Sequence, residues 1–143
     1  MNTEQYKKLI ERANKRPKKS DRQRLKGKLD KMCSEYVRRR DFKQYKSLCP
    51  RCGHSLVDWH KLQWAHLISR VHLKTRWNES AAIGICAGCH FYVDSHAEVK
   101  IAFAVQILGQ ERYDILLDAS TRTDYKVDMK LIELYLQKLL EEV

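Results

Sequence analysis

Two Cys-x-x-Cys pairs are the most chemically specific pattern in this sequence of 143 residues. Cys49 and Cys52 form the first pair, Cys86 and Cys89 form the second, and 33 residues separate them. A Cys-x-x-Cys turn places two thiolates at the separation that a tetrahedral Zn²⁺ needs, and two such turns complete a four-thiolate site. A redox-active Cys-x-x-Cys, the competing interpretation, would need only one pair. The spacing therefore predicts a closed structural zinc site, which leaves no coordination position for catalysis.

Three of the six histidines stand where they could do acid–base or metal chemistry. His66 ends a predicted strand in WAHLISR, His90 directly follows the second cysteine pair, and His96 falls in the first turn of a predicted helix. Zinc would draw the segment after Cys89 towards the strand that carries His66. A neutral imidazole there could take a proton from water beside a phosphate, while the helix side held a divalent cation. The alternative is that all three are packing residues around a zinc ribbon. The other three are assigned to the surface: His54, His60 and His72.

The net charge of +10 is concentrated in the first third of the chain. Residues 1–48 contain 17 Lys and Arg against 6 Asp and Glu, whereas residues 49–99 and 100–143 are close to neutral. A basic arm on a near-neutral body is the electrostatic footprint of a nucleic-acid-binding protein. The alternative is a solvated basic helical face without a specific partner.

Composition predicts one soluble, cytoplasmic domain. Hydrophobic residues make up 43% of the chain, which argues against wholesale disorder. The longest uncharged apolar run, residues 101–108, is too short to span a bilayer, and the N-terminal segment is too polar for a secretory signal. Five cysteines without an export signal argue against disulfides. We therefore expect no membrane association.

Apolar periodicity predicts the helix that would carry the basic residues. Ser20 is a candidate N-cap, and the apolar residues that follow it recur at steps of three and four, which predicts a helix of about five turns. Cys33 lies on this stripe and is expected to be buried. Residues 1–19 are predicted to be a short helix or a loose arm. The stripe consists of Leu25, Leu29, Met32, Cys33, Tyr36 and Val37.

The remaining elements frame the candidate site. Residues 62–68 and 83–85 are predicted to be two short paired strands. Ser95 and Glu98 have the spacing of a capping box, which predicts a helix that starts there and ends at Gly109. Further helices are expected over residues 110–118 and 127–141. The apolar stripe of the last helix is expected to pack in the core rather than to form a dimer seam.

The segments CPRCG, WAHLISR, RWN and CAGCHFYVDSH, in this order, resemble the HNH branch of the His-Me finger (ββα-metal) nucleases. Within that branch they are most similar to phage recombination nucleases of the NinG/Rap type and related phage HNH proteins, over residues 25–118. The resemblance implies an α+β fold, in which a small ββα-metal core is clasped by the four-Cys zinc and flanked by N- and C-terminal helices. It divides one compact domain into a basic arm and helix (1–48), the core and following helices (49–118) and a C-terminal helix (119–143).

The resemblance also implies a function, the hydrolysis of DNA phosphodiester bonds in phage recombination or DNA processing, in the cytoplasm of the host cell. His66 matches the general base, and His90 and His96 match positions that hold the catalytic Mg²⁺, Mn²⁺ or other divalent metal. Arg70 and Arg76 match positions that face phosphate. The basic helix is expected to grip DNA, which could be branched or single-stranded, through Arg38, Arg39 and Arg40.

Two departures from the HNH pattern leave a second function open. Many HNH enzymes have an acidic residue before the base histidine, where this chain has Ala65. The Asn of the family falls at Ala81, and Asn78 stands three residues earlier, about 10 Å along a strand. Asn78 could therefore take the catalytic role only with a different loop path. The alternative to an endonuclease is a catalytically degenerate HNH scaffold that serves as a DNA-binding or adaptor module; the oligomeric state stays open.

Overall fold

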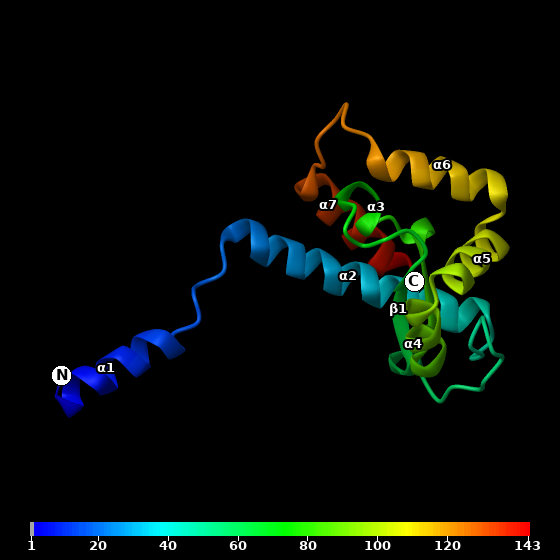
Figure 1. The fold of residues 1–143 in the computed structure, drawn as a ribbon. Coiled ribbons are helices and arrows are strands. Elements are labelled where there is room, and N and C mark those ends of the chain that lie inside the picture. The colour runs from blue at the N-terminus through cyan, green and yellow to red at the C-terminus, as the bar shows by residue number, and fades with distance from the viewer. Residues whose placement is uncertain (1) are drawn as a thin grey trace.

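The computed structural model describes residues 2–143, which form a mixed α+β fold (Figure 1). The α+β class predicted from the sequence is confirmed. Within the described range no helix combines the length and the apolar character needed to cross a bilayer. The two strands of the single sheet are β1 (Leu62–His66) and β2 (Ala82–Cys86). The seven α-helices of this range are α1 (Thr3–Asn14), α2 (Asp21–Gln44), α3 (Leu73–Arg76), α4 (Ala87–Ser95), α5 (Ala97–Leu108), α6 (Gln110–Thr121) and α7 (Met129–Glu142).

The first helix, α1, extends away from the rest of the chain (Figure 1). Asn2 caps it, because its side chain accepts a hydrogen bond from the backbone N–H of Gln5. No residue of α1 is buried, and its apolar side chains Tyr6, Leu9 and Ile10 are exposed. Of the two predictions for residues 1–19, the short helix is the correct one.

The long helix α2 lies against both the sheet and α7. Ser20 is its N-cap, as predicted, and its 24 residues make about 6.7 turns rather than five. Its buried residues recur every four positions: Leu29, Cys33, Val37 and Asp41. The first three pack with Trp77, Ala82, Met129 and Leu136 in one apolar cluster. Cys33 is fully buried, which confirms its predicted packing role, and desolvation raises the pKa of its thiol to about 12.

The antiparallel hairpin β1–β2 is packed between two layers of helices. Its register pairs Leu62 with Cys86 and His66 with Ala82. Side chains alternate between the faces of a strand, so Trp64 joins the α2 cluster. The other face contributes Ala65, Ile83 and Ile85 to a second cluster, with Val93 of α4 and Phe103 and Ala104 of α5. The hairpin therefore fixes the spacing between α2 on one side and α4 and α5 on the other.

A buried carboxylate joins α2 to β2. Asp41 is 1% exposed, and its Oδ2 accepts a hydrogen bond of 2.6 Å from the backbone N–H of Gly84. Arg40 donates to both oxygens of Asp41, at 2.7 and 3.1 Å, and also to the carbonyl oxygens of Glu79 and Ala82. A Cβ at Gly84 would meet the Cα of Arg38 at 3.4 Å. A side chain at this position would therefore touch both α2 and Leu62, whose Cδ1 would lie 3.3 Å from that Cβ.

The predicted capping box at the start of α5 is wrong. Ser95 is the last residue of α4, and its hydroxyl donates to the carbonyl oxygen of Phe91 at 2.7 Å. His96 stands at the N-cap of α5 without a side-chain capping bond. The predicted end of the helix is confirmed, because Gly109 has φ 80° and its N–H donates to the carbonyl of Val105.

Asp41→Ala should lower the free energy of unfolding by about 3–5 kcal/mol, because it leaves the guanidinium of Arg40 without its buried counter-charge. Urea unfolding at constant metal loading measures this loss. Glu35→Ala is the matched control on the same helix, since it removes only a partly exposed ion pair with Arg39 and should cost about 1 kcal/mol or less. Equal losses for the two variants would contradict the anchoring role of Asp41.

Candidate functional site

The four cysteines of the two pairs converge at one end of the hairpin. Cys49 and Cys52 lie on the turn before β1, where Gly53 takes φ 74° and donates its N–H to the carbonyl oxygen of Cys49. Cys86 ends β2, and Cys89 lies in the first turn of α4. All four sulfur atoms lie within 4.8 Å of one another, and those of Cys52 and Cys86 are 3.8 Å apart. Tetrahedral zinc–thiolate bonds of about 2.3 Å require sulfur atoms about 3.8 Å apart. The four thiols could therefore hold a metal ion such as zinc.

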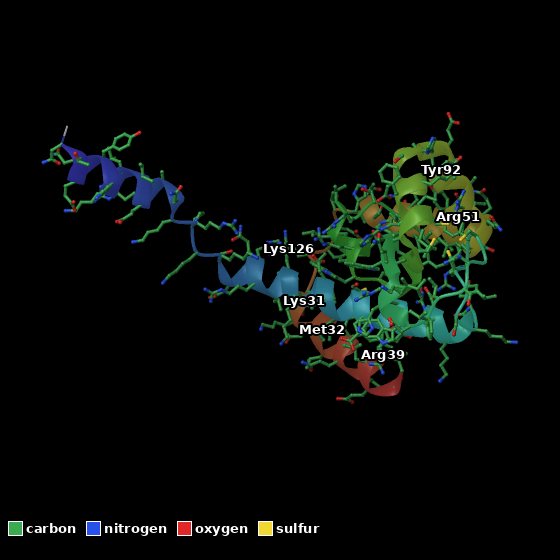
Figure 2. All side chains as sticks on the ribbon, turned by 90° about the horizontal axis from the view of Figure 1, so that it is seen from below. Lys31, Met32, Arg39, Arg51, Tyr92 and Lys126 are labelled. Carbon is green, nitrogen blue, oxygen red and sulfur yellow. The ribbon has the colours of Figure 1, made fainter. Side chains whose placement is uncertain are left out.

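The electrostatics of the four thiols favour a bound cation. Burial opposes ionisation of Cys49, but backbone N–H groups, foremost that of Cys52, lower its pKa to about 7. Burial and the neighbouring sulfur atoms raise the pKa of Cys89 to about 12, although Arg51 donates to its sulfur at 3.6 Å. Figure 2 shows Arg51 and Tyr92 beside these sulfur atoms, with the guanidinium 4.7 Å from the tyrosine ring centre. A divalent cation would relieve the repulsion that opposes full deprotonation.

His66 is the last residue of β1 and is 8% exposed. Its Nε2 lies 3.1 Å from the carbonyl oxygen of Arg76, and its ring centre lies 4.1 Å from that of Trp64. Because a carbonyl oxygen can only accept, Nε2 is the protonated nitrogen and Nδ1 is a free acceptor in the neutral ring. Desolvation lowers the pKa of His66 to about 4, with nearby Arg70 and Arg76 contributing. The imidazole is therefore neutral at pH 7.

Asp30 of α2 holds the loop segment that binds His66. Its carboxylate accepts hydrogen bonds from Arg76 at 2.7 and 2.9 Å and from Nε1 of Trp77 at 2.8 Å. Arg70 approaches the same carboxylate at 3.6 Å. Burial would raise the pKa of Asp30, but these donors outweigh it and lower the pKa. Through Arg76, an ionised Asp30 thus fixes the carbonyl that orients His66.

The two histidines that were assigned to the metal make other contacts. Nδ1 of His90 lies 2.8 Å from the side-chain oxygen of Gln63, and its Nε2 lies 3.1 Å from the carboxylate of Asp94. His96 donates from Nδ1 to the carbonyl oxygen of Tyr92 at 2.9 Å, and its ring centre lies 4.4 Å from that of the tyrosine, with the two rings tilted by 33°. Across residues 2–143, the four cysteines are the one group of three or more Cys, His, Asp or Glu side chains placed to bind a metal.

The structure does not bring His66 and His90 together in such a group. His66 shares a face of β1 with Trp64, as their ring contact shows. Gln63, the partner of His90, lies on the opposite face of the strand. A site that used both histidines would have to reach around the end of β1.

Asn78 supports the loop between the strands and makes no hydrogen bond to His66 within the described chain. Its side-chain oxygen accepts from the backbone N–H of Ser80 and so caps a short 3₁₀ turn over Glu79–Ala81. The buried Ala81 accepts a backbone hydrogen bond from Leu67 at 2.8 Å, which closes the base of the loop. Position 81 therefore contributes a backbone carbonyl to the loop and a buried methyl group to an apolar cluster with Ile68 and Leu116.

The five arginines that were predicted to bind DNA fall into two groups. Arg38 and Arg70 line a cavity of about 490 Å³ together with Lys31 and Trp64. Arg38 also stacks on Trp59, with its guanidinium carbon 4.9 Å from the ring centre. The other three lie outside this cavity: Arg39 contacts Glu35 and the backbone oxygen of Val143, Arg40 contacts Asp41, and Arg76 contacts Asp30. Arg38 and Arg70 are engaged within the protein as well, with the carbonyl oxygen of Ser34 and with Asp30.

Sequence reasoning missed three acidic residues that shape this region. Asp41 follows Val37 by four residues, so the period of the buried stripe could have revealed it. Asp94 follows His90 by four residues, which places both on one face of α4. Asp30 binds Arg76, which lies 46 residues further along the chain, and no local signal in the sequence indicates that pairing.

Replacing one cysteine of the cluster should remove the metal. Cys52→Ser should reduce the bound metal from about one ion per chain to near zero, because zinc favours a complete tetrahedral donor set. Inductively coupled plasma mass spectrometry on purified protein measures the metal content. Cys33→Ala is the matched control, since Cys33 is buried on α2 outside the cluster. Retention of the ion by Cys52→Ser, or its loss from Cys33→Ala, would refute the assignment.

The low pKa of His66 should make stability depend on pH. The folded state holds the ring neutral down to a pKa of about 4, whereas the unfolded chain binds the proton near 6.5. Folding stability should therefore fall as the pH drops from 6.5 to 4, by up to roughly 3 kcal/mol from this group. In His66→Gln, the free energy of unfolding should fall less between pH 6.5 and pH 4 than in the parent. Chemical unfolding at a series of pH values measures this difference. A variant slope equal to that of the parent would count against the burial effect.

Comparison of the chain with protein-family models, with curated proteins and with solved structures gives no match. The HNH resemblance therefore stays a prediction from the four sequence segments that carry it.

Proposed function

We propose that the protein is a metal-dependent endonuclease that hydrolyses phosphodiester bonds in DNA. The observation that carries the proposal is the state of His66: a neutral ring with Nε2 bound to a backbone carbonyl and Nδ1 free to accept a proton. It stands at the end of β1, which pairs with β2 across a connection that contains α3, and α4 follows β2 directly. This order of two paired strands and a helix agrees with the HNH resemblance.

In this proposal, Nδ1 of His66 accepts a proton from the water that attacks the phosphorus atom. General base catalysis of this kind contributes typically 10²- to 10⁴-fold to a rate. Arg70, which is exposed beside the cavity that Trp64 lines, would pair with a phosphate oxygen. The hydrogen bond from Nε2 to Arg76 keeps the ring in the tautomer that this step needs.

A catalytic cation would find two donor groups on α4. His90 and Asp94 are one helical turn apart and lie 3.1 Å from each other. Mg²⁺ is commonly held by one or two carboxylates, with water and substrate phosphate completing its shell, so this pair fits such an ion without a dedicated protein cage. When bound, the cation would supply charge stabilisation for the leaving oxygen. The bond between His96 and Tyr92 leaves His96 as a more distant candidate.

The charge distribution supports DNA as the substrate. Most of the excess Lys and Arg lies in residues 1–48, which form the exposed α1 and the long α2. Cations along such elements displace counterions from the DNA backbone, so binding should weaken steeply with salt. In the same proposal the four-Cys cluster holds structural zinc and ties the turn before β1 to α4.

His66→Ala should reduce metal-dependent nicking of supercoiled plasmid by 10²-fold or more, because the general base is removed. DNA binding and metal content should stay near those of the parent. His54→Ala is the matched control, since this histidine is exposed on the first cysteine turn, and it should cleave like the parent. Equal cleavage by the parent and His66→Ala would remove His66 from the mechanism.

A second candidate function is a DNA-binding or adaptor module on a scaffold that has lost catalysis. Three observations favour it: Ala65 stands where an acidic metal ligand would precede the base, His66 is 8% exposed, and His90 lies beyond the opposite face of β1. DNA binding without nicking by the parent protein, in Mg²⁺, Mn²⁺, Ni²⁺ and Zn²⁺ alike, would establish this function over the endonuclease.

A further inference from the structure

A second, larger cavity lies outside the site that contains His66. It has a volume of about 590 Å³ and opens between the first turn of α2, helix α3 and the loop that joins α6 to α7. The chain thus brings together residues near positions 22, 72 and 125, which are far apart in the sequence. The side chains that matter for its chemistry are Arg22, His72, Lys74, Arg122, Tyr125 and Lys126.

The cations that line this cavity, which we call the groove, are compensated only in part by acidic side chains. Arg122 is paired with Asp124, at 2.6 and 3.0 Å. Within residues 2–143 no salt bridge joins an acidic side chain to Arg22, Lys74 or Lys126, although the charge of Asp124 also acts on Lys74. Three positive charges that converge on one cavity attract an anionic chain more strongly than the same charges spread over a surface.

The groove also contains an exposed aromatic ring. Tyr125 is 48% exposed, and Nζ of Lys74 lies 4.6 Å from its ring centre. Proteins that bind single-stranded nucleic acid combine a positively charged groove for the backbone with aromatic side chains on which bases stack. In a duplex the base faces are already stacked on one another, so Tyr125 could contribute little to duplex binding.

The groove continues towards the region of His66. Val71 and His72 line it, whereas Arg70, one residue earlier, lines the cavity beside Trp64. Helix α2 passes both cavities, with Arg22 at the groove and Lys31 at the cavity beside Trp64. Figure 2 shows Lys126 beside the N-terminal half of α2 and Lys31 along the same helix. A single strand of nucleic acid held in the groove would therefore leave it near His66, the candidate catalytic histidine.

We infer that this groove binds a single-stranded segment of DNA, with phosphates held by Arg22, Lys74 and Lys126 and a base stacked on Tyr125. The inference rests on the proposed function in taking DNA as the substrate. It assigns to residues outside the catalytic region the recognition of a single-stranded flank next to the cleaved bond.

The test compares the binding of a fluorescent oligothymidylate with that of a blunt duplex of equal length, by anisotropy, without added divalent metal or chelator. Tyr125→Ala should weaken single-strand binding by about 5- to 150-fold, which is the effect of losing one stacked base. Duplex binding should change by less than about 2-fold. Tyr125→Phe should bind the single strand like the parent, because it keeps the ring.

The cations are tested through the salt dependence of single-strand binding. Lys126→Gln should reduce the slope of log K against log salt by about 0.7, the value for one phosphate contact on a single strand. Lys138→Gln is the matched control, since Lys138 is an exposed cation of α7 outside the groove. Its slope should equal that of the parent.

The inference is overturned if Tyr125→Ala binds the single strand like the parent, or if it weakens single strand and duplex equally. These outcomes are separate from failure of the proposed function, which is read from plasmid nicking. If the parent protein never nicks DNA but Tyr125→Ala loses single-strand binding, the groove binds single strands and the proposed nuclease function is rejected. Nicking by a parent whose single-strand binding does not depend on Tyr125 would do the reverse.

Discussion

The contact between Asp41 and Gly84 sets the distance between α2 and the hairpin, and the rest of the fold depends on that distance. A two-stranded sheet leaves the outer N–H and C=O groups of each strand without a ladder partner. On β2, Asp41 accepts the N–H of Gly84, and Arg40 donates to the carbonyl of Ala82. Side chains of α2 thus satisfy the strand edge that a third strand would otherwise cover. Gly84 leaves the space between this strand and the helix free of a side chain, since a Cβ there would lie 3.4 Å from the Cα of Arg38.

This close approach also places the candidate catalytic histidine. Asp30 lies on the same helix as Asp41, and its bonds to Arg76 and Trp77 hold the loop between the strands. The carbonyl of Arg76 then fixes the ring of His66. At the other end of the hairpin, the four cysteines link the turn before β1 to the start of α4. The hairpin is therefore fixed at one end by an ionised carboxylate and at the other by thiols suited to a metal ion.

The parts of the structure that could be predicted are those whose signals are local in sequence. The four-Cys cluster, the two strands, the helix end at Gly109 and the burial of Cys33 all follow from spacing or periodicity, and the structure confirms them. The capping box at Ser95 failed because α4 continues through that residue, which the same four-residue pattern cannot reveal. Arg40 could be recognised as basic but not as an internal ligand, because its partners include carbonyls about 40 residues away.

The weakest contact of the Asp30 cluster, that of Arg70, is the one that bears most directly on the proposed mechanism. Arg70 lies 3.6 Å from Asp30, whereas Arg76 and Trp77 approach within 2.9 Å. A phosphate could therefore take Arg70 while Asp30 keeps its stronger donors and the carbonyl that orients His66 stays in place. The added negative charge near His66 would favour the protonated ring and raise its pKa above the value of about 4 that burial gives it. In the proposed mechanism, a ring that is a weak base in the free protein would thus become a stronger base when a phosphate binds beside it, which is the direction that general base catalysis requires.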